Sequence, residues 1–200
     1  MNTIRLHRVF LLTAALLACV LAPVAADGLS WDAVKSKMLT SEGYKLNYVY
    51  EGPEGRFSFR YTIRGACKEI LTEVLEGSAR GGGTRIYFNP EKDKENVFLA
   101  TRFLTLRRSL GARDIKGSSL YQSLFAQIVS ELPGQIPAGV NRAKDKIIFE
   151  FGDANGALAK LVVDAQGNPL AYRRIENGKE VKSMVFNGLR WGAHSIDWES

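Results

Sequence analysis

The clearest pattern in the sequence is a strict alternation of apolar and polar residues over positions 56–64. The apolar positions are Phe57, Phe59, Tyr61 and Ile63, and arginine, serine or threonine occupies the positions between and beside them. Because successive side chains of a β-strand point to opposite faces, this alternation predicts a strand with one apolar and one basic face. Such a strand is typical of an antiparallel sheet that is packed on one face and solvated on the other.

The segment before it alternates in the same way. Residues Tyr44–Tyr50 place their tyrosines and Leu46 on one side. Between the two segments, the sequence Glu-Gly-Pro-Glu-Gly at 51–55 predicts a turn, since Pro and Gly each favour backbone angles that turns require. The two strands are therefore predicted to form a hairpin.

Three more segments of the first half are predicted as strands. Lys68–Glu76 fits a helix or a strand, and we interpret it as a strand because its neighbours are strands on short connections. Thr84–Phe88 is predicted to be a short strand. Val97–Leu106 is predicted to be one long strand that is covered on both faces, because it is apolar at many positions on both sides. The Arg-Gly-Gly-Gly sequence at 80–83 lacks the Gly-Lys-Ser/Thr ending of a phosphate loop, so it predicts a flexible connection.

Two helices are predicted. Trp31, Val34 and Met38 follow the capping residue Ser30 at helical spacing, and this helix ends near 41–43. A second helix follows the capping pair at 118–119 and ends at Pro133-Gly134. Its apolar stripe consists of Leu120, Leu124, Phe125, Ile128, Val129 and Leu132. A stripe this wide must pack on an apolar surface, and the aromatic face of the sheet is its predicted partner.

In the last third of the chain, the sequence predicts a loop at 135–143 and then a β-meander. Its strands are expected at 146–151, 158–164, 170–176 and 179–186, with shorter ones at 189–191 and 196–198. Asn177-Gly178 is typical of a type I′ hairpin turn, and Asn187-Gly188 predicts a further turn.

The first 26 residues predict a secretory signal peptide. Arg5 and Arg8 precede an apolar run at 9–21, and small residues at 24–26 suit a signal peptidase. Residues 27–200 are then expected to form a single periplasmic domain. A membrane anchor is the alternative, but the run from Val9 to Ala26 is barely long enough to span, and Pro23 lies near its end. A lipobox ending at Cys19 is a third interpretation, although the apolar run continues beyond that cysteine.

Charge and cysteine content narrow the choice of partners. The formal net charge is +6, and loss of Arg5 and Arg8 leaves 25 basic against 21 acidic residues, or +4. This mildly basic balance does not predict a nucleic-acid partner.

After cleavage only Cys67 remains, so no internal disulfide is expected. Cys67 is interpreted as a small buried apolar residue, with pairing between chains as the alternative.

The residue types of the common catalytic and metal sites are missing or scattered. His194 is the single histidine after cleavage, and it has no Gly-x-Ser-x-Gly sequence to accompany it. No zinc or calcium motif is present, so we expect no catalysis, no metal and no cofactor. Arg102, Arg107 and Arg108, with Arg113 nearby, predict either a solvated strand end or a patch for an anionic head group or acidic partner.

The order of elements and a few short motifs carry a family resemblance. The meander contains Leu-Val-Val-Asp-Ala-Gln-Gly-Asn-Pro-Leu at 161–170, then Asn177-Gly178, then Val-Phe-Asn-Gly-Leu-Arg at 185–190. With the signal peptide, the early helix and the mid-chain helix, this pattern resembles the periplasmic lipoprotein carriers of the LolA/LolB type and the related RseB-like sensor domains.

The resemblance implies an α+β fold, mainly antiparallel β: a curved incomplete β-barrel covered by helices, with acyl chains bound between sheet and helices. The implied lipid-binding residues are Phe57, Phe59, Tyr61, Ile63, Leu120, Leu124, Phe125 and Ile128. The same residues could instead fill an ordinary closed core. The implied function is an exported, monomeric carrier of lipid or lipoprotein acyl chains. The alternative is a non-catalytic envelope sensor on the same fold, which recognises a protein or an anionic glycolipid.

Overall fold

The computed structural model describes residues 28–65, 69–77, 82–93, 96–101, 105–109 and 123–198, with 105–109 described as backbone. The predicted signal peptide lies outside these residues, as do Cys67, Arg102, Arg113 and Leu120. The described chain consists of two helices and an 11-stranded antiparallel sheet.

The first helix, α2, spans Trp31–Thr40 and confirms the prediction. The hydroxyl of its N-cap residue, Ser30, accepts a hydrogen bond from the Ala33 amide at 3.2 Å, which satisfies one of the donors exposed at a helix start. Trp31, Val34 and Met38 are buried, so the helix packs through one apolar stripe.

The first four strands agree with the alternation in the sequence. They are β1 (Gly43–Gly52), β2 (Gly55–Arg64), β3 (Glu69–Glu76) and β4 (Arg85–Phe88). The predicted hairpin is confirmed, and it is tight: Gly52 pairs with Gly55, which leaves Pro53 and Glu54 as the turn. The interpretation of Lys68–Glu76 as a strand is also confirmed over Glu69–Glu76 by β3, and Lys68 lies outside the described residues.

The prediction of one long strand at 97–106 is wrong. The chain instead forms β5 (Asn96–Ala100) and β6 (Thr105–Ser109), which pair antiparallel with Leu99 opposite Leu106. The reversal was hidden because residues 101–104 contain no Gly, Pro, Asn or Asp that would signal a turn.

The second helix, α4, spans Leu124–Ser130 and is shorter than predicted. Its N-cap is Ser123, and not the serine pair at 118–119: the Ser123 hydroxyl accepts from the Ala126 amide at 2.9 Å. Leu132 lies beyond the helix and is still buried, so the apolar stripe extends past its end.

The C-terminal strands are β7 (Gly139–Arg142), β8 (Lys146–Gly152), β9 (Leu158–Asp164), β10 (Pro169–Glu176) and β11 (Lys179–Trp191). Asn177 and Gly178 both have positive φ, 51° and 73°, which confirms the type I′ turn. The predicted loop at 135–143 is wrong in part, because β7 pairs with β8 at the edge of the sheet. Of the residues that suggested a loop, Pro137 lies before β7 and Gly139 begins it, so neither interrupts the strand.

Asn187-Gly188 does not form the predicted turn. Strand β11 continues through it to Trp191, and Gly188 has a φ of 64°. Lys45 pairs with Arg190 and Asn47 with Asn187, so two residues of β11 lie opposite the single residue Leu46. This is a β-bulge, in which a glycine with positive φ is as suitable as it is in a turn. Residues 196–198 also form no strand.

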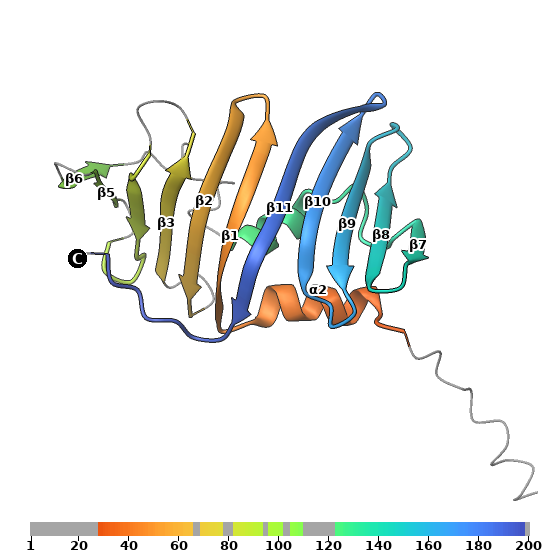
Figure 1. Cartoon of the computed structure of the whole chain (residues 1–200), viewed down its shortest axis with the longest axis horizontal. Helices are drawn as coiled ribbons and strands as arrows, with labels where there is room; N and C mark the ends of the chain where they lie inside the picture. The colour runs from red at the N-terminus through yellow and green to blue at the C-terminus, as the bar shows by residue number, and fades with distance from the viewer. Residues whose placement is uncertain are drawn as a thin grey trace, which may run out of the picture.

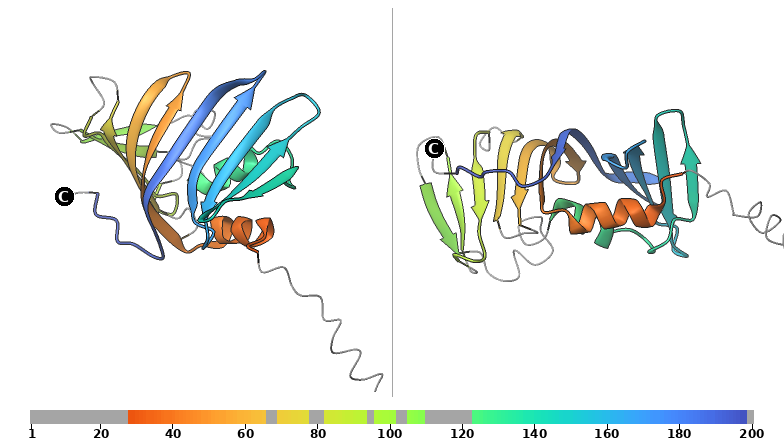
Figure 2. Two further views of the ribbon diagram at one scale, coloured as in Figure 1. Left: turned by 45° about the vertical axis from the view of Figure 1, so that its right-hand side comes forward. Right: turned by 90° about the horizontal axis from the view of Figure 1, so that it is seen from below.

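The strand order is β6-β5-β4-β3-β2-β1-β11-β10-β9-β8-β7, so the first and last strands lie side by side in the middle of the sheet (Figure 1). The sheet is curved, and both helices lie on its inner side (Figure 2). We call this side the concave face and the other side the convex face. The predicted fold class, a curved and open β half-barrel covered by helices, is confirmed.

The cap of α4 gives a first testable prediction. Replacing Ser123 with alanine is expected to lower the free energy of unfolding by about 1 kcal/mol, because the Ala126 amide loses its acceptor. Urea denaturation followed by circular dichroism measures this change. The exposed cap Ser30, with its longer hydrogen bond, is the matched control and should give a smaller loss when replaced with alanine. An unchanged midpoint for Ser123→Ala would contradict the prediction.

Candidate functional site: the concave face

The middle of the concave face is built from paired aromatic side chains of β1 and β2. Tyr44, Leu46, Tyr48 and Tyr50 alternate along β1, and they lie opposite Ile63, Tyr61, Phe59 and Phe57 of β2 respectively. Residues directly opposite each other in antiparallel strands share a face, so the alternating pattern of both strands produces one continuous apolar surface.

Helix α4 covers the half of this surface that contains Tyr44 and Tyr61. Phe125 is fully buried and stacks on Tyr44 with 4.4 Å between ring centroids. The Tyr44 hydroxyl accepts a hydrogen bond from the Phe125 amide at 3.2 Å, and Tyr61 packs on the same tyrosine at 5.8 Å. Five of the predicted lipid-binding residues are buried in this half: Tyr61, Ile63, Leu124, Phe125 and Ile128.

Phe57 and Phe59 lie at the other end of β2 and remain partly exposed. Phe59 stacks on Tyr48 with centroids 4.9 Å apart, and Phe57 lies 6.0 Å from Phe59 and 6.4 Å from Tyr50. Burial raises the pKa of Tyr48 above its usual value, and neighbouring Tyr50 adds to the effect, so both rings of this end stay neutral at physiological pH.

The partly exposed apolar surface continues across the neighbouring strands. Val74 of β3 lies opposite Phe59, and Ile86 of β4 lies opposite Leu99 of β5. All of these side chains are only partly buried, in contrast to the residues under α4. We call this surface the concave patch, and it consists of Phe57, Phe59, Val74, Ile86 and Leu99.

A polar cluster borders the aromatic end at the C-terminus of α4. The Glu131 carboxylate accepts two hydrogen bonds from Lys182, at 2.8 and 2.9 Å, and its backbone carbonyl accepts one from Arg174 at 3.4 Å. Burial and a hydrogen bond to Glu54 raise the pKa of Tyr50 to about 12, which keeps this phenol protonated. The cluster fixes the end of α4 over β10 and β11, and sequence reasoning missed it because its members lie on distant segments.

The arginines of β2 face the convex side, and β3 supplies acids to two of them. Arg60 pairs with Glu73 at 2.9 Å, and Arg64 pairs with the buried carboxylate of Glu69. The Tyr87 hydroxyl donates to the same Glu69 carboxylate at 2.5 Å. Glu69 and Glu73 are four residues apart and therefore lie on one face of β3. Antiparallel pairing of β3 with β2 could have predicted these cross-strand ion pairs from the sequence.

The predicted anionic-partner patch falls on β6. Arg107 and Arg108 lie opposite Phe98 and Val97 of β5, and Arg102 lies outside the described residues. This patch therefore remains a prediction.

Groups with catalytic or metal-binding potential are sparse in the described part of the chain. No three His, Cys, Asp or Glu residues gather there in a way that could hold a metal ion. The His194 ring donates from Nε2 to the Arg190 carbonyl oxygen at 3.0 Å. Neither described helix is long and apolar enough to cross a membrane.

An open antiparallel half-barrel with helices on its concave face is the fold of the LolA/LolB/RseB-like proteins. Among solved structures, the chain is similar to an uncharacterized conserved protein from Thermus thermophilus, with a TM-score of 0.52 and 10% identity over 84% of this chain and 90% of that one. It is similar to MucB with a TM-score of 0.51 and 13% identity over 87% of this chain and 62% of MucB, so it spans less than two thirds of that protein.

A domain whose structure is described as that of an outer membrane lipoprotein-sorting protein from Vibrio parahaemolyticus matches with a TM-score of 0.38 and 9% identity, over 78% of this chain and 88% of that domain. No family model and no curated protein matches the sequence. The two matches with TM-scores above 0.5 show the fold alone.

Proposed function

We propose that this protein is an exported carrier of the outer-membrane lipoprotein sorting type, which holds acyl chains of a lipid or lipoprotein against the concave patch. In this proposal residues 1–26 are removed as a signal peptide, and residues 27–200 act as one periplasmic domain. Binding and release require no bond chemistry, so the protein works without a catalytic group or cofactor.

The observation that carries the proposal is the uneven covering of the concave face. Under α4 the aromatic residues are fully buried, whereas Phe59, Val74 and Leu99 keep part of their surface accessible. The concave patch crosses four strands, β2 to β5, which corresponds to roughly 14 Å at the usual spacing of strands. That span can hold a segment of an extended acyl chain, and each buried methylene would contribute about 0.8 kcal/mol.

The alternative is a binding module for an envelope protein. MucB, which has the same fold, has been crystallised with MucA. This chain also has an open sheet edge at β7, where Val140 is exposed and Ile136 is 81% exposed. A partner segment could add to that edge as a further strand.

Mass spectrometry of the protein purified from its native envelope distinguishes the two functions. A co-purifying acylated species supports the carrier, and a stoichiometric protein partner without lipid supports the binding module.

A matched pair of substitutions tests the concave patch directly. Phe59→Glu is expected to weaken binding of the fluorescent fatty acid cis-parinaric acid at least tenfold, because a carboxylate enters the apolar surface. Ser58→Glu adds the same charge one position away, on the convex face between Arg56 and Arg60, and should leave binding unchanged. Thermal melts establish that both variants fold. Equal binding by wild type and Phe59→Glu would refute the proposed site, and unfolding of Phe59→Glu would identify the patch as core.

A further inference from the structure

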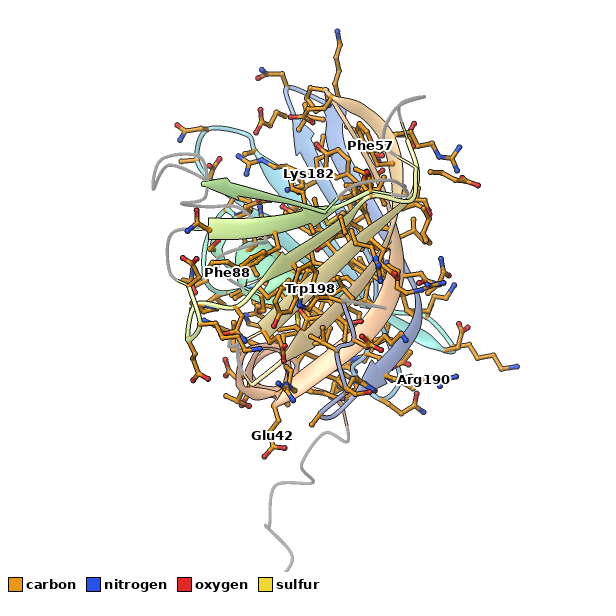
Figure 3. All side chains as sticks on the ribbon, turned by 90° about the vertical axis from the view of Figure 1, so that its left-hand side faces the viewer. Glu42, Phe57, Phe88, Lys182, Arg190 and Trp198 are labelled. Atoms are coloured by element: carbon orange, nitrogen blue, oxygen red, sulfur yellow. The ribbon has the colours of Figure 1, made fainter. Side chains whose placement is uncertain are left out.

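The convex face has a hollow of about 370 Å³ where β1, β2 and β11 meet. Its lining residues are Lys45, Leu46, Asn47, Arg60, Gly188, Arg190 and His194. Arg190 lies at the lower end of the sheet in Figure 3. The hollow is on the face opposite the concave patch, so it is separate from the proposed acyl-chain site.

The β-bulge of β11 shapes this hollow. Gly188 and Leu189 together lie opposite Leu46, which disturbs the regular ladder at this point. The positive φ of Gly188 suits glycine, and a Cβ placed on it would meet no atom within 4 Å, so the space above the bulge is open. Bulges commonly redirect side chains next to functional sites.

The charges around the hollow are unbalanced. Lys45 and Arg190 are direct cross-strand partners, and both are exposed on the same face. Like charges directly opposite each other in an antiparallel pair are destabilising. Within the described part of the chain neither forms an ion pair, and Arg60 is the lining cation that has an acidic partner, Glu73.

The remaining lining groups can complete an anion site. Asn47 lies opposite Arg60 and offers a side-chain amide donor. His194 lines the hollow and is held by its Nε2 hydrogen bond to the Arg190 carbonyl oxygen, and we assign it no role as an anion ligand. Arginine and lysine together bind phosphate oxygens well, because guanidinium donates in a planar fork and ammonium acts as a point charge.

We propose that this hollow is a binding site for a phosphate group, with Lys45 and Arg190 as its principal ligands and Arg60 and Asn47 at its edge. A bound phosphate would neutralise the repulsion between the two opposing cations. The same chemistry is offered by a free phosphate ester and by a phospholipid head group, and the experiment separates these sources.

The test follows the Asn47 side-chain and His194 ring signals by NMR while inorganic phosphate is added at constant ionic strength with chloride. Saturable shifts are expected for the wild type. Arg190→Gln and Lys45→Gln should each weaken binding at least fivefold, and the matched control Arg56→Gln, an exposed convex arginine outside the hollow, should not. Linear shifts without saturation, or equal weakening by Arg56→Gln, would overturn the proposal.

Two further measurements distinguish a phosphate site from a diffuse basic surface. In phosphate-free buffer Lys45→Gln should raise Tm, since it removes the like-charge pair, and it should abolish the Tm increase that phosphate gives to the wild type. Vesicles of phosphatidylglycerol identify the source: retention that depends on Lys45 and Arg190 together with saturable phosphate binding indicates a phospholipid head group. Vesicle retention without any phosphate saturation indicates a diffuse basic surface and refutes the site.

Discussion

Replacing Phe125 with alanine is expected to lower the free energy of unfolding by about 3–5 kcal/mol. The ring is fully buried and lies between Tyr44, Phe186 and Trp191, at centroid distances of 4.4, 5.7 and 5.5 Å. Helix α4 has only 7 residues, and helices shorter than about 12 residues are marginal without tertiary packing. Loss of this ring therefore removes both core volume and the aromatic contacts that hold the helix against the sheet.

Urea denaturation, followed by circular dichroism and by tryptophan fluorescence, measures the loss. Phe57→Ala is the matched control, because Phe57 is partly exposed at the end of the same face and should cost only about 1–2 kcal/mol. If the two substitutions cost the same, Phe125 does not anchor α4 in the way its contacts indicate.

Replacing Trp31 with alanine is also expected to cost about 3–5 kcal/mol. Trp31 is buried at the start of α2 and packs on Phe149 and Phe151 of β8, with centroids 5.6 and 4.9 Å away. Its indole N–H donates to the backbone carbonyl of Gln135 at 2.9 Å. One side chain thus connects the first helix, a C-terminal strand and the segment after α4.

Trp31→Phe separates the two contributions. Phenylalanine retains most of the buried aromatic surface and loses the indole donor, so we expect a loss of about 1–2 kcal/mol from the hydrogen bond and the smaller ring. The same denaturation measurement applies to both variants. A phenylalanine variant as unstable as the alanine variant would show that the hydrogen bond, and not the packing, dominates.

The sequence predicted those parts of the fold in which local pattern and tertiary structure agree. The β1–β2 hairpin follows from alternation on both sides of the Pro53-Glu54 turn, and Asn177-Gly178 forms the turn that its residue types favour. The pattern failed where one signal serves two structures. Asn187-Gly188 supplies positive φ to a bulge instead of a turn, and β5 and β6 reverse without a turn residue.

The candidate site was predicted less completely. Both apolar surfaces, the sheet face and the helix stripe, could be read from spacing alone. The boundary between filled core and accessible surface could not, because it depends on how far α4 extends: Tyr61 is fully buried, whereas Phe59 on the same strand is not. The opposition of Lys45 and Arg190 was equally hidden, since it arises from the pairing of the first strand with the last.

That pairing has a consequence for the order in which the chain can fold. Strand β1 obtains its second neighbour only from residues 179–191, so during synthesis from the N-terminus one edge of the β1–β2 hairpin stays open until nearly the whole chain has emerged. An open apolar strand edge invites pairing with other chains. If the chain crosses a membrane unfolded, a chaperone bound to the first hairpin would prevent such pairing until the last strand has emerged.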